Sequence, residues 1–307
     1  MISYYKTLEG KITPIAEYEP GCWINVIDPT EDEILGLIDD HDLVTDFISA
    51  ALDEEESSRI ESEDGTTLII MDLPVVDKNN DNITYYTMPV GIMITDTSVI
   101  TVCLKENPVI SEFAEGVVKG VHTNLRTQFV LHLMLRVATR YLQYLKQIDK
   151  ISDHVEKELR KSMKNKELIQ LLEISKSLVY FSSALKADEI TMEKMMRGRY
   201  VKLYEEDQDL LDDVIIELKQ AIEMANIYLN ILSGMMDAFA SVISNNLNIV
   251  MKVLASITLL MSIPTIISGL YGMNVANIPV QNFWFPVGLS VVAMLVAGYV
   301  LYRKKML

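Results

Sequence analysis

Apolar residues recur at alternating steps of three and four along the second half of this chain. Ten positions follow that spacing: Leu211, Ile215, Leu218, Ile222, Ala225, Leu229, Leu232, Met236, Phe239 and Ile243. The spacing predicts a helix buried along one seam, as in a coiled coil or a helix bundle. No proline occurs between Pro108 and Pro264, and no glycine between Gly120 and Gly198. Because these residues most disfavour helix interiors, we predict helices at about 121–162, 166–202 and 206–272.

Two apolar runs without a charged residue close the chain, at 253–272 and 283–302, and each is twenty residues long. About twenty apolar residues are needed to cross a bilayer core as a helix. Only ten residues, Met273 to Asn282, separate the runs. The pattern predicts a helical hairpin through a membrane. If the helix at 206–272 is continuous, it is on the order of 100 Å long at 1.5 Å per residue and enters the membrane directly.

Basic residues set the expected orientation of this hairpin. Lys252 precedes the first run, Arg303, Lys304 and Lys305 follow the second, and the connecting loop has no charge. The positive-inside rule then places both termini in the cytosol and the loop outside. Residues 1–10 show no basic segment followed by an apolar one, so no signal peptide is expected. We therefore expect a multi-pass protein of the cell membrane, with the lipid bilayer as one partner.

A second stripe on the long helix is polar. It comprises Asn230, Gly234, Asp237, Ser241, Ser244, Asn248, Met251, Ala255, Thr258, Ser262, Thr265 and Gly269, of which only Met251 and Ala255 are neither polar nor glycine. Within a bilayer, polar side chains face protein or water rather than lipid. The stripe favours a water-lined pore, and the alternative is close packing between helices. Two spans cannot enclose a pore, so a conducting protein must be a ring of identical copies.

The first 115 residues read as a mixed α/β region. Short β-rich runs at 22–27, 67–71, 88–94 and 99–104 are separated by turn signals, and helices are expected at 31–40 and 42–56. The predicted fold class is an α+β cytosolic domain, an α/β/α sandwich, followed by long helices and the membrane hairpin. The predicted domains are an α/β domain, a helical hairpin, a stalk helix and a transmembrane hairpin with a basic tail, at 1–115, 116–205, 206–252 and 253–307.

Charge and composition exclude several classes of function. Up to Glu115 the chain has 25 acidic and 5 basic residues, so nucleic acid is not an expected partner; cations are, although a merely soluble acidic surface is the alternative. Cys22 and Cys103 form no CxxC pair. The histidines are scattered, and neither a glycine-rich phosphate loop nor an HExxH motif occurs. We therefore expect neither an enzyme nor an organic cofactor.

At the end of the first span, Tyr271-Gly-Met-Asn274 resembles the signature of the CorA magnesium-channel family. The flanking segments 248–254 and 264–274 resemble that family as well, and weaker likeness extends upstream through Leu178-Val-Tyr-Phe181 and Arg59-Ile-Glu61. The resemblance implies a funnel-shaped homopentamer that admits Mg²⁺, often also Co²⁺ or Ni²⁺. It also implies closure by bound intracellular Mg²⁺.

The resemblance assigns Gly272, Met273 and Asn274 to the selectivity filter. Mg²⁺ dehydrates reluctantly, so a ring of asparagine carbonyls and backbone oxygens suits the hydrated ion, whereas a carboxylate ring would release it more slowly. Outside this context, glycine and asparagine would simply end a helix.

Below the filter, Asn248, Met251 and Leu254 match family positions near the narrow cytosolic neck. Met251 and Leu254 are candidates for an apolar gate, the alternative being packing in the bundle. With the stripe residues Thr258, Ser262 and Thr265 they complete the expected pore lining.

Asp213 aligns with a family aspartate that binds regulatory Mg²⁺ across the subunit interface, and six of the nine residues from Glu205 to Asp213 are acidic. Acids gathered at an interface repel until a divalent cation binds. A solvated acidic helix start is the alternative. Some family members carry acidic residues upstream that bind the same ion, and the aligned positions here are Ser49 and Ala50. The acidic partner of Asp213 must then come from residues 53–56, and Asp53 and Glu54 are the candidates.

The outer loop 275–282 lacks the glutamate that many relatives carry, so attraction of cations there would rest on Asn274, Asn277 and carbonyl groups. Two other functions stay open. One is Zn²⁺ efflux, as in the related ZntB branch, and the other is a non-conducting, metal-responsive membrane scaffold.

Overall fold

The structure is a computed structural model that describes the chain except residues 80–81, 163–164, 275–279, 281 and 307. It divides into two compact units, Met1–Ser233 and Gly234–Leu307, each with its own internal packing. The predicted outer loop, including Asn277, falls largely on residues outside the described ones.

A mixed sheet of seven strands organises the first unit. Its order is β2-β1-β3-β7-β6-β5-β4, and among the described residues only the β3–β7 pair is parallel. The strands are β1 (Ile2–Leu8), β2 (Lys11–Ile15), β3 (Trp23–Ile27), β4 (Arg59–Glu63), β5 (Thr66–Asn79), β6 (Asn82–Ile94) and β7 (Val99–Cys103). The predicted mixed α/β region is confirmed.

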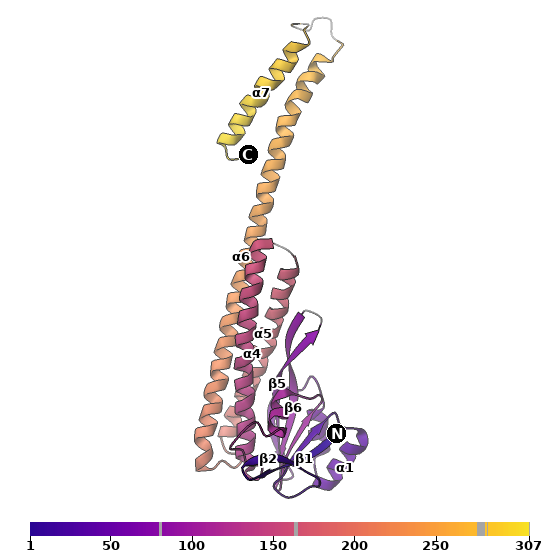
Figure 1. The fold of residues 1–307 in the computed structure, drawn as a ribbon, viewed down its shortest axis with the longest axis vertical. Coiled ribbons are helices and arrows are strands. Elements are labelled where there is room, and N and C mark those ends of the chain that lie inside the picture. The colour runs from indigo at the N-terminus through magenta and orange to yellow at the C-terminus, as the bar shows by residue number, and fades with distance from the viewer. Residues whose placement is uncertain (80–81, 163–164, 275–279, 281, 307) are drawn as a thin grey trace. The chain divides into compact units, whose positions relative to one another are not determined.

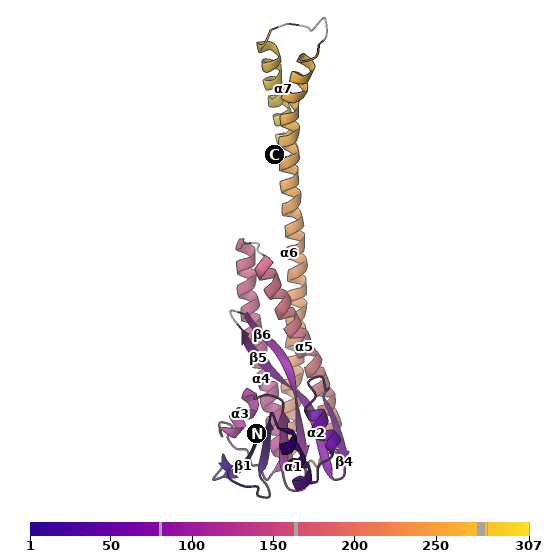
Figure 2. The same ribbon diagram turned by 90° about the vertical axis from the view of Figure 1, so that its right-hand side faces the viewer.

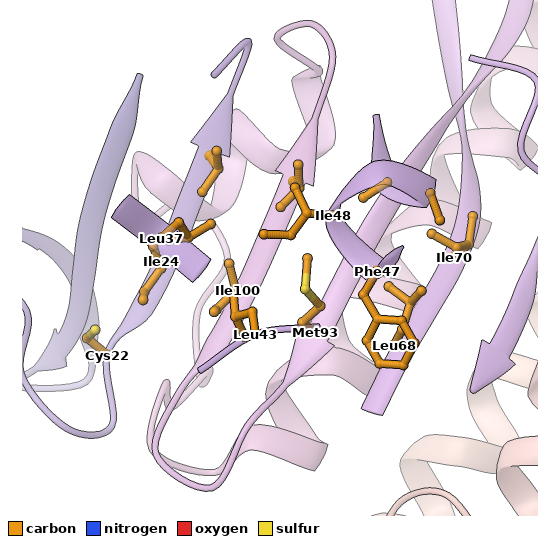
Figure 3. Packing of buried hydrophobic residues seen from close by; sticks show 14 residues of the cluster. Cys22, Ile24, Leu37, Leu43, Phe47, Ile48, Leu68, Ile70, Met93 and Ile100 are labelled. Atoms are coloured by element: carbon orange, nitrogen blue, oxygen red, sulfur yellow. The ribbon is translucent and has the colours of Figure 1, made fainter. Parts of the chain in front are cut away.

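One face of the sheet is covered by α1 (Glu31–His41) and α2 (Thr45–Ala51). The α1 helix begins with a capping box, in which the Thr30 side chain and the Glu33 side chain each bind the other's backbone amide. Phe47 and Ile48 of α2 lie against strand residues such as Met93 (Figure 3). Fourteen buried residues form this apolar core, which fixes α2 on the sheet.

The opposite face is covered by α3 (Pro108–Ala114), α4 (Arg126–Ser162) and α5 (Asn165–Met196), which are labelled together in Figure 2. Aromatic rings dominate this layer: Trp23 of β3 packs on Phe129 of α4 with centroids 5.3 Å apart, and Tyr141 meets Phe181 edge-on at 5.0 Å. Helices on both faces make the unit an α/β/α sandwich, which confirms the predicted fold class.

Several predicted boundaries were wrong for local reasons. The helix expected at 42–56 is only Thr45–Ala51, because Asp42 takes a left-handed conformation (φ 51°) that separates it from α1. The helix expected to reach 202 ends at Met196, because Gly198 (φ 64°) turns the chain and its amide donates to the Met195 carbonyl.

The third long helix, α6, runs without interruption from Gln208 to Tyr271, 64 residues that include Pro264, and a single 3₁₀ turn, η1 (Glu205–Asp207), precedes it. In the first unit its apolar seam is confirmed: Leu211, Leu218, Ala225 and Leu232 are at most 4% exposed. In the second unit Phe239 is 6% exposed, as the seam predicts, whereas Ile243 is 41% exposed, so at that position the predicted burial is absent from the single chain.

The second unit consists of the rest of α6 and α7 (Trp284–Arg303), which returns alongside the end of α6 (Figures 1 and 2). Both helices contain windows of mean hydropathy 2.0, long and apolar enough to cross a membrane. Those windows are only 6% and 11% buried within the described chain. Apolar helices with so much exposed surface are stable only where lipid or protein shields them from water, so the structure fits a membrane environment.

Candidate functional site

The α7 helix covers one particular face of α6. Ser256 is 1% exposed, and its hydroxyl donates to the carbonyl of Met306 at 3.0 Å. Farther along, Leu260 lies against Gly298, and the rings of Tyr271 and Phe285 are 6.3 Å apart. At about 100° per residue, Ser256, Leu260 and Tyr271 share one side of the helix. This side is the contact with α7.

The polar stripe lies on the other side of α6. Counting about 100° per residue from Ser256, Thr258, Ser262 and Thr265 are roughly 120–180° away from it. Thr258 and Thr265 are exposed and Ser262 is half-buried. A lipid-facing position would suit none of these hydroxyls, and α7 leaves Thr258 and Thr265 uncovered.

The stripe hydroxyls donate to their own helix. Thr258 donates to the carbonyl of Leu254 at 2.9 Å, Ser262 to Leu259 at 2.8 Å, and Thr265 to Met261 at 3.2 Å. Each proton is therefore satisfied inside α6, while the oxygen keeps lone pairs as acceptors. Such oxygens can accept hydrogen bonds from water around a cation.

The residues expected at the neck are uncovered in the single chain. Every residue from Ser241 to Ala255 is exposed; Met251 is 55% and Leu254 57% exposed. Asn248 belongs to the same segment. Met251 and Leu254 lie about 60° apart on the helix, so in a ring of copies both side chains can approach the axis.

Gly272 closes the last turn of α6. Its amide donates to the carbonyl of Ser268 at 2.9 Å, and a side chain in its place would begin 3.2 Å from that oxygen. Met273 and Asn274 follow outside the helix, and both are exposed. The Asn274 side chain is thus presented at the end of the same helix that carries the stripe.

The expected sensor residues lie on two elements of the first unit. Asp213 is exposed in the second turn of α6, while Asp53 and Glu54 are exposed just after α2. Asp53 accepts from the amide of Glu55 at 2.9 Å, and Glu54 pairs with Lys105 at 3.3 Å. Among the residues that the structure describes, no three acidic, histidine or cysteine side chains gather as a metal site.

Sequence reasoning missed Ser256. It sits between two stripe positions, and no pattern distinguishes it from a pore-lining hydroxyl. Only the packed hairpin reveals that it holds the end of α7. Through this bond Lys252, Arg303 and Lys304 lie at the same end of the hairpin. The basic residues named from the sequence are therefore gathered together.

Comparisons with known proteins cover nearly the whole chain. The model of the family described as CorA-like Mg²⁺ transporter protein matches residues 19–304. The cobalt/magnesium transport protein CorA of Methanocaldococcus jannaschii is 26% identical over 298 residues, covering 92% of this chain and 90% of that protein. The cobalt/magnesium transport protein CorA of Thermotoga maritima is 22% identical over 311 residues, covering 98% and 87%.

Among solved structures, the complete CorA magnesium transporter of Methanocaldococcus jannaschii superposes with a TM-score of 0.85 at 23% identity. The superposition covers 99% of this chain and 98% of that one. At this identity the likeness concerns the fold, from the first strand to the second apolar helix.

Proposed function

Because this chain belongs to the CorA-like Mg²⁺ transporter family, we propose that it conducts hydrated Mg²⁺ into the cell through a homopentameric pore. Membership places it among transporters of divalent cations in membranes rather than among enzymes. Co²⁺ and Ni²⁺ are further candidate cargo, and Mg²⁺ on the cytosolic side closes the pore.

The observation that carries this proposal is the position of the polar stripe opposite α7. Thr258, Ser262 and Thr265 would face hydrocarbon in an isolated hairpin, which is unfavourable for polar groups. Placing identical α6 helices around one axis, with α7 on the outside, removes the stripe from lipid. It also lines a shared path with oxygen acceptors for the water shell of the ion.

At the outer mouth, the proposed filter is the ring of Asn274 side chains with backbone oxygens of Gly272 and Met273. Amide and carbonyl oxygens bind the water shell through hydrogen bonds without displacing it. This matters for Mg²⁺, which loses its waters reluctantly. Because each contact is neutral, the ion is released readily to the next position.

At the inner end, the proposed gate is the apolar pair Met251 and Leu254, which can close by excluding water. The proposed sensor is Asp213 of one subunit facing Asp53 or Glu54 of the next. Bound Mg²⁺ neutralises these acids and holds the subunits together. When the ion leaves, like charges repel and the ring loosens.

The orientation follows from the basic residues. The Ser256–Met306 hydrogen bond holds Lys252 and the basic tail at the same end of the hairpin. The positive-inside rule then assigns that end, and both termini, to the cytosol. The mouth with Asn274 faces outward, so entry through it is influx.

The test is Mg²⁺ flux into liposomes containing the parent protein or Asn274→Ala. The variant should abolish uptake without changing the oligomer, as measured by size-exclusion chromatography with light scattering. Asn282→Ala is the matched control, since this asparagine lies just before α7, where its side chain accepts from the Trp284 amide at 3.2 Å. Unchanged uptake by Asn274→Ala would rule out its filter role.

The same liposomes distinguish the two other functions. Zn²⁺ export that needs a pH gradient, with no Mg²⁺ uptake, would indicate a ZntB-like exporter. No flux of Mg²⁺, Co²⁺, Ni²⁺ or Zn²⁺ from well-formed oligomers would indicate the metal-responsive scaffold.

A further inference from the structure

A fully buried acid lies in the last third of α5. Asp188 is 1% exposed, and its Oδ1 accepts from the Ser58 hydroxyl at 2.9 Å and from the Asp72 amide at 3.2 Å. The same Ser58 hydroxyl is 3.4 Å from Oδ2 of Asp72. The carboxyl groups of α5 and β5 therefore meet around one hydroxyl.

The place of this contact in the sheet explains why an acid can sit there. Strand β4 pairs with β5 only up to Ile70, and the Asp72 amide beyond that point donates to Asp188. On the other neighbour, β6, Pro89 stands opposite Asp72. The carboxyl group of Asp188 thus accepts a hydrogen bond from a backbone amide that has no partner in strand β4.

No positive charge reaches the pair within the described part of the chain. Neither Asp72 nor Asp188 takes part in any of the ion pairs there. The nearby Arg59 of β4 pairs with Glu56 and Glu61 instead. From α4, the Tyr141 hydroxyl donates to the backbone carbonyl of Asp72 at 3.0 Å, leaving both carboxyl groups without a cation.

The second oxygen of Asp188 completes the argument. Oδ2 is buried and has no hydrogen-bond partner among the residues that the structure describes. A buried carboxylate without a cation is strongly unfavourable, whereas a neutral carboxylic acid has a proton on one oxygen and can donate it. We propose that Asp188 holds a proton at neutral pH, forming a proton-binding site beside Asp72 that fastens α5 to the sheet.

The electrostatics of the site agree with this assignment. Burial, reinforced by the neighbouring Asp72 charge, raises the pKa of Asp188 well above its usual value. Burial also raises the pKa of Asp72 to about 6, against a smaller opposing effect of the Ser58 hydroxyl. One proton therefore stays with the pair at neutral pH, while the second leaves near pH 6.

This proton links pH to the helices of the first unit. Six residues before Asp188 in α5, the Ser182 hydroxyl donates to Asn226 of α6 at 3.0 Å. Loss of the proton from Asp188 would leave a buried negative charge beside that of the half-buried Asp72, and the two charges would repel and loosen α5 from β5. The proton site therefore makes the attachment of α5 to β5 sensitive to pH. It is separate from Asp213, Asp53 and Glu54, and it does not depend on ion conduction.

Thermal unfolding of the full-length protein in detergent between pH 5 and pH 8 tests the fastening. The parent binds a proton when folded that it lacks when unfolded, so its unfolding equilibrium constant should rise about tenfold per pH unit from this group. Asp188→Asn keeps the shape and a donor but cannot ionise. Its melting temperature should therefore rise relative to the parent as pH increases.

Glu193→Gln is the control, because it removes one acid from the exposed side of the same helix. Its melting temperature should keep a constant offset from that of the parent. A constant offset for Asp188→Asn as well would overturn the proposal.

Infrared spectroscopy detects the proton directly, and its deciding measurement is made on the parent protein. The parent at pH 7 should show the C=O stretch of a protonated carboxylic acid, which disappears at high pH. Asp188→Asn should lack this band at pH 7. Absence of the band from the parent at pH 7 would overturn the proposal.

Discussion

Gly91 fixes how closely α2 can approach the sheet. It lies on β6 between Ile70 and Val102, and a Cβ atom added to it would lie 2.2 Å from the Cβ of Ala51. The backbone Cα of Ala51 would be 3.2 Å away, so no side-chain rotation can relieve the clash. Non-bonded carbon atoms pack at about 3.5–4.0 Å, so Gly91→Ala requires α2 to shift by more than about 1 Å.

The expected loss follows from this overpacking. Extra methyl groups in a packed core destabilise by about 1–3 kcal/mol. For a domain of this size each kcal/mol lowers the melting temperature by roughly 2–4 °C, so Gly91→Ala should lower it by about 2–12 °C. The assay is thermal unfolding followed by circular dichroism.

Ala51→Gly provides the matching compensation, because it removes the methyl group with which the new side chain collides. Alone it should destabilise by about 1–2 kcal/mol, from a lost buried methyl group and helix propensity. Combined with Gly91→Ala, it should restore part of the loss, a coupling of about 1 kcal/mol or more. Strict additivity of the two losses, or a parent-like Gly91→Ala, would refute the reasoning.

Two further predictions concern charged groups of the first unit. Asp213→Ala should weaken the protection that Mg²⁺ gives the cytosolic part against proteolysis, and identical protection in mutant and parent would exclude Asp213 as a sensor. Glu112 pairs with Arg136 and Arg140, and although burial opposes it, the hydrogen bonds from both arginines hold its pKa below the usual value. Its contribution is present at neutral pH and is lost as pH falls through that lowered pKa. Glu112→Gln should therefore lower the melting temperature at pH 7 and reduce its fall toward acid pH; a fall as steep as the parent's would contradict this.

The sequence predicted the long helices well because their signals are local. The absence of proline and glycine and the apolar seam indicated α4, α5 and α6 to within a few residues at most ends. The exceptions have local causes too, such as the turn at Gly198. Strand β4 was missed as a strand because it contains one apolar residue, Ile60, as an edge strand can.

Of the candidate site, the sequence predicted only the regular spacing of its polar residues along α6. The stripe of Thr258, Ser262 and Thr265 is visible in the sequence, but the face that α7 covers depends on packing between two helices. For the same reason Ser256 was not singled out from the sequence. Asp188 was not singled out either, because its burial depends on β5, which lies more than a hundred residues earlier in the chain.

The central claim is that one face of α6 lines a water-filled path, and cysteine accessibility tests it most directly. The native Cys22 and Cys103 are 0% exposed, so they should give little background. Thr265→Cys lies on the stripe, and Ile267→Cys, two residues on, lies on the side facing α7. In proteoliposomes, a charged thiol reagent that cannot cross lipid should modify Thr265→Cys and block Mg²⁺ flux while leaving Ile267→Cys unmodified. Equal reaction at both positions, or modification of Ile267→Cys alone, would contradict the account.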